Sequence, residues 1–274
     1  MDFKNKTVFI TGASRGIGLE IAKKLASAGA NIIIAAKTAE PHPKLQGTIF
    51  SAAEEIERLG GRALPCMVDI RDENQVLAAV EKAVSTFGGI DILINNASAI
   101  QLSGTLETDI KRFDLMHGVN ARGTFLVSKA CLPHLLKSAN PHVLTLSPPL
   151  NFEARWFQHH VAYSMAKFGM SLVTLGMAAE FKGKVAFNSL WPRTIIATAA
   201  IEFAVGNAEM MLNARKPSIM ADAAAEILAR DFKTCTGNYF IDDAVLAEAG
   251  VTDFADYKVD PTVEDRSLIP DFFI

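Results

Sequence analysis

Two side chains that can exchange a proton stand four positions apart, in Tyr163-Ser164-Met165-Ala166-Lys167. Apolar residues recur at helical spacing over residues 162–181, which predicts a helix there. Because positions i and i+4 share one face of a helix, the Tyr163 phenol and the Lys167 ammonium are expected to point the same way. A free phenol has a pKa of about 10, and a neighbouring cation lowers that pKa. The pair is therefore suited to give a proton to a carbonyl oxygen or to take one from an alcohol.

A glycine-rich loop joins the first predicted strand to the first predicted helix, with the sequence Thr11-Gly12-Ala13-Ser14-Arg15-Gly16-Ile17-Gly18. Glycine permits a tight turn and close approach to a pyrophosphate, and a helix N-terminus offers free N–H groups and partial positive charge. Such a turn can also occur without a ligand, and Tyr-x-x-x-Lys can be an ordinary surface pair. The strand-loop-helix context favours a dinucleotide site. The predicted cofactor contacts in this loop are Gly12, Ser14, Arg15, Gly16, Ile17 and Gly18.

The end of the second predicted strand, Ala35-Ala36-Lys37-Thr38, carries no carboxylate. An acidic residue at that position would bind the ribose 2′-hydroxyl of NAD. Lys37 and Arg15 are both cationic and are expected to converge on the adenosine ribose, where a 2′-phosphate would suit them. The sequence therefore favours NADP over NAD. In the alternative interpretation, Lys37 simply leaves the sheet into solvent.

Polar residues also follow the third and fourth predicted strands. Asp69 closes the third strand and is expected to hydrogen-bond the adenine; the alternative is a turn carboxylate, although Asp72 is the better cap for the next helix. Asn96 and Ala97 follow the fourth strand, where ligands bind in open α/β sheets. All three residues are predicted cofactor contacts.

Apolar runs typical of buried strands alternate with helical segments along the chain, which indicates a parallel sheet covered on both faces. We predict an α/β fold with one doubly wound domain, a Rossmann-type parallel sheet of about seven strands. The predicted strands span residues 7–11, 31–36, 63–68, 90–95, 142–147, 185–191 and 239–241. The predicted helices span residues 16–28, 51–59, 73–87, 109–119, 121–137, 162–181 and 221–229.

Residues 1–250 are expected to form the dinucleotide-binding domain. Residues 251–274 are rich in Asp and Pro and are expected to form a C-terminal arm packed on this subunit or on a neighbour. Residues 195–212 carry little charge and predict an apolar lid, although a dimer contact would have the same pattern. The loop over residues 38–49, which contains His42 and Lys44, is expected to cover the adenosine side of the cofactor.

The composition excludes several classes of protein. Half of the 274 residues are apolar and the net charge is −3, so the chain can bury a core and lacks the basic blocks expected of a nucleic-acid partner. The cysteines are odd in number and far apart, which argues against a disulfide framework or a zinc ribbon. His159 and His160 are adjacent and point apart on regular structure, so we expect no metal. With no signal peptide or membrane-length apolar run, we expect a cytoplasmic protein without a membrane span.

These motifs together resemble the short-chain dehydrogenase/reductase superfamily across nearly the whole chain. The resemblance implies that Tyr163 is the catalytic acid/base with Lys167 as its partner, and that Asn120 holds a water in the proton relay. It also implies that the Ile195 backbone meets the nicotinamide carboxamide and that the protein is a homo-oligomer. The residues that carry the resemblance are Thr11-Gly12-x-x-x-Gly16-x-Gly18, Asp69, Asn95-Asn96-Ala97, Asn120, Tyr163-x-x-x-Lys167 and Pro192.

The catalytic serine of that family is less well matched. Ser147 aligns with the first of two serines that end the fifth strand, and Pro148 falls on the second. Ser147 also lies 16 positions before Tyr163, three more than the family spacing. Two further departures are Ser98 and Arg193, which stand where the family has glycine. We keep Ser147 as a predicted catalytic residue that orients the substrate oxygen.

The leading hypothesis is an NADP-dependent oxidoreductase that transfers a hydride between nicotinamide and a carbonyl or secondary alcohol. The apolar lid suggests an apolar or lipid-like small-molecule substrate. The alternative, which Pro148, Arg193 and Ser98 motivate, is a cofactor-binding regulator or lipid-binding protein with little turnover. Enoyl reduction on the same fold ranks lowest, because that chemistry usually separates its tyrosine and lysine by more residues.

Overall fold

The computed structural model describes residues 2–41, 46–204 and 208–274, so His42 and Lys44 lie outside the described residues. Its strands pair in parallel throughout, in the sheet order β3-β2-β1-β4-β5-β6-β7. This is the doubly wound sheet that the sequence predicts. The strands are β1 (Thr7–Thr11), β2 (Asn31–Ala36), β3 (Arg62–Met67), β4 (Ile92–Asn95), β5 (His142–Thr145), β6 (Ala186–Trp191) and β7 (Tyr239–Ile241).

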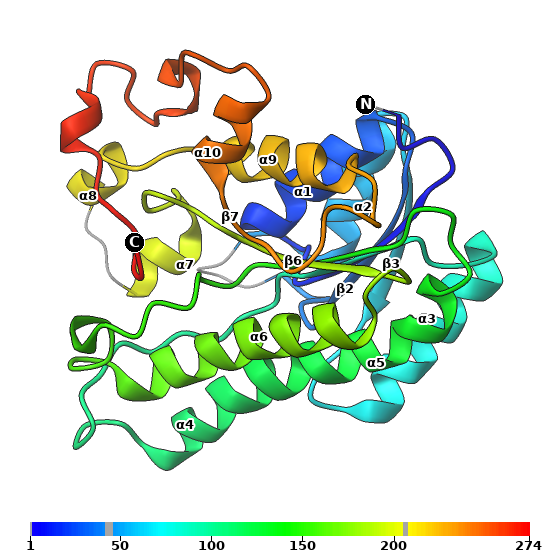
Figure 1. The fold of residues 1–274 in the computed structure, drawn as a ribbon, viewed down its shortest axis with the longest axis horizontal. Helices are drawn as coiled ribbons and strands as arrows, with labels where there is room; N and C mark the ends of the chain where they lie inside the picture. Colours follow the sequence, from blue (N-terminus) through cyan, green and yellow to red (C-terminus); the bar gives the residue numbers. More distant parts are fainter. Residues whose placement is uncertain (1, 42–45, 205–207) are drawn as a thin grey trace.

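Helices cover both faces of this sheet (Figure 1). Alternate residues of each strand point to opposite faces, so Val8 and Ile10 join one apolar cluster while Phe9 joins the other. The first cluster contains buried residues of α1, α2, α9 and α10, and the second contains those of α3, α5 and α6. The helices are α1 (Gly16–Ser27), α2 (Ile49–Arg58), α3 (Glu73–Phe87), α4 (Ile110–His117), α5 (Gly123–Leu135), α6 (Val161–Glu180), α7 (Ala199–Ala204), α8 (Ala208–Leu212), α9 (Ser218–Leu228) and α10 (Asp242–Glu248).

The direction of the winding reverses between β1 and β4. The chain first adds β2 and β3 on one side of β1 and then places β4 on the other side. The Thr11 hydroxyl at the end of β1 accepts hydrogen bonds from the backbone N–H groups of Asn96 and Ala97, both at 3.0 Å. The carboxyl ends of the two central strands are thereby tied together at the point where open α/β sheets bind ligands.

A π-helical turn, Gly118–Arg122, links α4 to α5. Asn120 lies in this turn and is fully buried. Its Oδ1 accepts from Ala99 N at 2.7 Å and its Nδ2 donates to Ala99 O at 3.0 Å. Single π-turns that interrupt helices are frequent at functional sites. Here the turn fastens the segment that follows β4 to the long helices of one face.

Helix α6 is, among the described residues, the one helix that passes a length-and-composition test for a membrane span. It is 20 residues long, and 61% of its most apolar window is buried against the rest of the chain. That burial is the pattern of a core helix, whose apolar face contacts protein. Two of its buried residues are Tyr163 and Lys167, in the first two turns.

The end of the chain returns to the carboxyl edge of the sheet. Pro270 forms an antiparallel bridge with Thr194, just beyond β6. The Phe273 side chain is 1% exposed, and it belongs to a third apolar cluster with Trp191 and Tyr163. In Figure 1 this red segment ends beside α7. The last residues of the arm therefore form part of the same cluster as the predicted acid/base.

Candidate active site

A cavity of about 1020 Å³ opens at the carboxyl ends of the strands. It extends from the glycine-rich loop to Tyr163 and Lys167, and its wall also includes residues of the segment after β6. Pockets of this size accept drug-sized and larger ligands. The predicted site residues that line it are Gly12, Ser14, Arg15, Gly16, Ile17, Lys37, Asp69, Asn96, Ala97, Tyr163 and Lys167.

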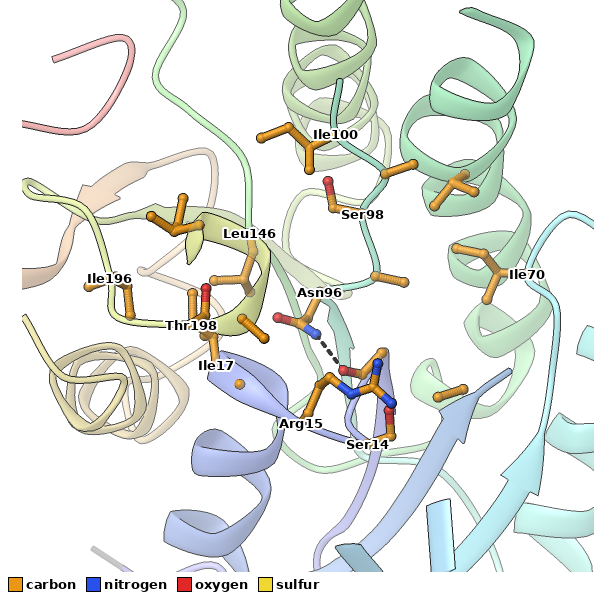
Figure 2. Close-up of a pocket in the computed structure, with 18 of the residues that line it drawn as sticks. Ser14, Arg15, Ile17, Ile70, Asn96, Ser98, Ile100, Leu146, Ile196 and Thr198 are labelled. Atoms are coloured by element: carbon orange, nitrogen blue, oxygen red, sulfur yellow. Dashed lines mark hydrogen bonds between the residues drawn. The ribbon is translucent and has the colours of Figure 1, made fainter. Parts of the chain in front are cut away.

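The glycine-rich loop packs directly against the residues that follow β4. The Asn96 amide donates to Gly12 O at 3.1 Å (Figure 2). It also donates to Thr11 O at 2.9 Å. A Cβ at Gly12, whose φ is +69°, would lie 2.9 Å from Ala97 Cα. A Cβ at Gly18 would lie 2.5 Å from the Asn96 amide nitrogen and 2.8 Å from Gly12 O. Gly18 is thus a packing residue that keeps the loop in place behind the cavity wall.

The N-terminus of α1 offers backbone donors that no N-cap side chain occupies among the described residues. Arg15 is the N-cap residue and makes no side-chain cap hydrogen bond, and the first turn contains no acidic residue. Gly16 has φ +58°, and a Cβ there would meet only Thr198 at ordinary contact distance. Uncapped N–H groups and the helix dipole fit a pyrophosphate. Gly16, Ile17 and the loop backbone would therefore hold the diphosphate of a dinucleotide.

Two cations line the end of the cavity near β2. Lys37 Nζ lies 3.4 Å from Asp69 Oδ2, and the Lys37 side chain is 60% exposed. The Arg15 guanidinium donates to Gly47 O. Asp69 accepts hydrogen bonds from Arg71, which hold the pKa of the carboxyl well below its usual range. Asp72, as expected, caps α3 by accepting from the N–H groups of residues 74 and 75.

The Tyr163 and Lys167 side chains are buried together, at 5% and 3% exposure. Lys167 Nζ donates to Leu146 O at 2.7 Å and lies 4.9 Å from the centre of the Trp191 ring. Burial lowers the pKa of Lys167 to about 7. Burial, followed by the charge of Asp271, raises the pKa of Tyr163. Burial and the charge of Asp271 thus outweigh the decrease in the Tyr163 pKa that we expected from Lys167. The phenol is therefore neutral and can donate a proton.

Besides Gly18, three predicted site residues do not line the cavity. Ser147 is fully buried, and its hydroxyl is 2.8 Å from the Ser189 hydroxyl, so a substrate oxygen cannot reach it in this conformation. Both polar ends of the Asn120 amide bond to Ala99. Ile195 donates its N–H to Ile269 O at 2.9 Å and accepts at its carbonyl from the N–H of residue 215. A carboxamide bound at the Ile195 N–H would have to displace that first bond.

The sequence interpretation missed Asp271. This carboxyl is 8% exposed and lines the cavity with Tyr163 and Lys167. Burial raises its pKa to about 7. Asp271 lies outside every helix and strand, so no periodic pattern places it. The available signal was the run Pro270-Asp271-Phe272-Phe273, which puts two aromatic rings beside one carboxyl.

Comparison with known families agrees with this fold and cavity. The family model for short chain dehydrogenases matches residues 6–231. The chain therefore belongs to the short-chain dehydrogenase family.

Particular relatives are closer still. The chain is 58% identical over 268 residues to hydroxysteroid dehydrogenase-like protein 2 of Danio rerio and of Homo sapiens, with 98% of this chain covered. It spans 63% of the length of those relatives. A crystal structure of a candidate dehydrogenase from Xanthomonas campestris is 55% identical, with a TM-score of 0.96 and coverage of 100% of this chain and 99% of that one. A 7α-hydroxysteroid dehydrogenase with NADH and 7-oxo glycochenodeoxycholic acid is 26% identical, with a TM-score of 0.75 and coverage of 88% and 93%.

Proposed function

We propose that this chain is an NADP-dependent oxidoreductase that interconverts a carbonyl and a secondary alcohol. The observation that carries the proposal is one cavity lined by the uncapped α1 N-terminus, by Lys37 and by the Tyr163–Lys167 pair. A dinucleotide site and a proton donor at opposite ends of one cavity are what hydride transfer to a carbonyl requires.

Each group of residues in the cavity has a separate role in this reaction. The bound nicotinamide supplies or accepts the hydride. The loop at Gly16 and Ile17 holds the diphosphate, and Asn96 keeps that loop in register. Tyr163 gives its phenolic proton to the substrate oxygen during reduction and takes it back during oxidation. Lys167, whose pKa is about 7, stabilises the phenolate that remains after the proton has left.

The experiment that tests the proposed function is a turnover assay with NADPH across a panel of ketones and aldehydes of increasing apolar size. We expect NADPH oxidation with at least one apolar ketone. Tight NADPH binding without oxidation on any member of the panel would contradict it.

The cavity wall also supports an apolar substrate. Most of the side chains between the glycine-rich loop and Tyr163 that are not already assigned to the cofactor are aliphatic. A polar group of the substrate that lies against this wall finds few hydrogen-bond partners apart from the reacting groups. An apolar substrate therefore pays the smallest desolvation free energy on binding. The larger aliphatic residues of the wall include Val68, Ile70, Ile100, Leu115, Val119, Leu146, Ile196 and Ile201.

Cofactor preference has a direct test at Lys37. The 7α-hydroxysteroid dehydrogenase relative contains NADH, so our preference for NADP rests on Lys37 and Arg15. A hydrogen bond to a charged group contributes about 1.5–3 kcal/mol, and exposure of Lys37 reduces that to the lower end. We expect Lys37→Ala to weaken NADPH binding roughly tenfold and to leave NADH binding unchanged. Fluorescence titration with each cofactor measures both dissociation constants.

Lys184→Ala is the matched control for that variant. Lys184 is exposed and precedes β6, at the edge of the sheet opposite the cavity. Equal affinity of the wild type for NADH and NADPH, or an unchanged preference in Lys37→Ala, would show that the cation does not read the 2′-phosphate.

A second candidate function is a cofactor-binding or lipid-binding protein with little turnover. The observation that favours it is the Ser147 hydroxyl, which is fully buried on Ser189 and removed from the cavity. Without a donor at that position, the substrate oxygen would be held by Tyr163 alone. Loss of one such donor typically costs about 10²–10³-fold in kcat.

A further inference from the structure

The end of the C-terminal arm is anchored to the strand end that borders the active site. Ile269 O accepts from Ile195 N at 2.9 Å, and Asp271 N donates to Arg193 O at 3.0 Å. The Trp191 indole donates to Phe272 O at 2.7 Å. These three hydrogen bonds attach residues 269, 271 and 272 to the end of β6 and to the segment that follows it, so the arm is a fixed wall of the cavity.

Arg193, which stands where the family has glycine, is one of the anchors. Its N–H donates to Asp242 at 2.9 Å, and its guanidinium forms an ion pair with Asp243 at 2.6 Å. Its carbonyl receives the Asp271 N–H. Arg193, which departs from the family's glycine, is therefore also the residue whose carbonyl holds the Asp271 backbone in place.

Aromatic rings of the arm surround Tyr163. The Phe272 and Phe273 ring centres are 6.5 and 6.4 Å from that of Tyr163. Phe273 also packs edge-on against Phe168 at 5.2 Å and against Trp191 at 5.9 Å. This packing buries the Tyr163 ring and holds the end of the arm against it.

That residue is Asp271, a buried carboxyl on the cavity wall. One carboxyl oxygen, Oδ1, accepts from Phe272 N at 2.6 Å. Within residues 2–41, 46–204 and 208–274, no hydrogen bond is found for the other oxygen. The carboxyl lines the same cavity as Tyr163 and Lys167, and the ring of its neighbour Phe272 lies beside that of Tyr163.

The site otherwise lacks the donor that its family provides by a serine. Ser147 is bonded to Ser189, and Pro148, which aligns with the second serine, has no hydroxyl. Pro148 O instead accepts from the Ser171 hydroxyl at 2.6 Å. The side of the cavity next to Tyr163 is completed by the arm.

We propose that Asp271 is a catalytic residue whose neutral carboxyl donates a hydrogen bond to the substrate oxygen beside Tyr163, in the place of the missing serine. No proton is transferred from Asp271, so the hydride and the Tyr163 proton alone complete the reduction. The inference rests on the proposed function and names a further group of the same site.

The charges around Asp271 support a neutral carboxyl. The pKa of Asp271 is raised to about 7, because burial and, to a smaller extent, the charge of Asp242 raise it more than the Phe272 N–H and Lys167 lower it. Asp242 is itself buried, with a pKa raised to about 6. Arg193 directs its charge to Asp243, and the phenol of Tyr163 is neutral. The donor is present below about pH 7 and is lost as the pH rises through that value.

Two substitutions distinguish the hydrogen-bond donor of Asp271 from its titratable charge. Asp271→Asn keeps a donor and removes the titration, while Asp271→Ala removes both. We expect Asp271→Asn to retain kcat within about threefold and Asp271→Ala to lose roughly 10²–10³-fold. NADPH affinity should be unchanged in both. Asp265→Asn, at an exposed position of the same arm, is the matched control.

The pH dependence of kcat/KM for carbonyl reduction gives an independent readout. In the wild type, both the neutral Asp271 and the charged Lys167 are needed, so log(kcat/KM) should fall with a limiting slope of about −2 at high pH. In Asp271→Asn only Lys167 titrates, and the slope should be about −1. A purely structural Asp271 would leave the slope unchanged.

An infrared difference spectrum completes the test without turnover. The wild type minus Asp271→Asn should show a neutral carboxylic acid band below pH 7 that disappears above it, whereas the Asp242 band cancels. Asp271→Ala as active as the wild type, Asp271→Asn as inactive as Asp271→Ala, or absence of the band would overturn the inference. The proposed function survives those results if the wild type turns over and Tyr163→Phe does not; if the wild type reduces no carbonyl, both fail.

Discussion

Replacing Tyr163 with phenylalanine is expected to lower kcat for carbonyl reduction by roughly 10²–10⁴-fold. The substitution removes the phenolic proton and keeps the ring that packs against Phe272 and Phe273. Because the ring remains, stability and NADPH affinity should change little. Steady-state rates with the best ketone of the panel, together with NADPH fluorescence titration and thermal unfolding, measure the three quantities.

Tyr239→Phe is the matched control, because the Tyr239 hydroxyl also makes a partly buried hydrogen bond, to Ser171 O at 2.9 Å, and does not line the cavity. It should retain wild-type turnover. Wild-type turnover in Tyr163→Phe would refute the assignment of Tyr163 as the acid, whatever happens to cofactor binding.

Gly18→Ala is expected to weaken cofactor binding by displacing the glycine-rich loop from the side that faces away from the cavity. Its Cβ would lie 2.8 Å from Gly12 O, a backbone atom that cannot rotate away, and 2.5 Å from the Asn96 amide. Overpacking of this kind costs about 1–3 kcal/mol of stability. Displacement of the loop should also lose at least one hydrogen bond to the diphosphate, about 1.5–3 kcal/mol, or roughly ten- to hundredfold in NADPH affinity.

Gly176→Ala provides the control, since Gly176 lies in α6 and a Cβ there would meet nothing within 4 Å. Alanine is the better helix former by about 1 kcal/mol, so this variant should be at least as stable as the wild type. Urea unfolding and NADPH titration compare the two. If Gly18→Ala bound NADPH with wild-type affinity, the tight packing of the loop on Asn96 would not be required.

The fold was predictable because its strands lie in a sheet that is buried on both faces. A segment such as Asn31-Ile32-Ile33-Ile34-Ala35-Ala36 has no exposed face, so a buried strand of this kind appears in the sequence as an unbroken apolar run. The same local logic placed Tyr163 and Lys167 on one helix and the glycine-rich loop before another. These parts of the site depend on residues that are only a few positions apart, so their arrangement can be predicted directly from the sequence.

The remaining parts of the site depend on contacts between distant segments. Ser147 follows a strand as expected, but its direction is decided by Ser189 on the next strand. Asp271 lines the cavity with Lys167 in a segment that Trp191, Arg193 and Ile195 hold by hydrogen bonds. The Tyr163 pKa is raised because burial and a distant carboxyl act on it, which a neighbouring lysine in the sequence does not reveal. Helices α7, α8 and α10 are short and lack a long periodic pattern, so they were not predicted as helices.

The anchoring of the arm has a consequence for biosynthesis. All seven strands have left the ribosome once residue 241 has emerged, and chains generally fold from the N-terminal side during synthesis. At that moment the glycine-rich loop, Tyr163 and Lys167 have been synthesised, while the residues of the wall that carries Asp271 have not yet emerged. The wall next to Tyr163 is therefore the last part of the site to be made during translation.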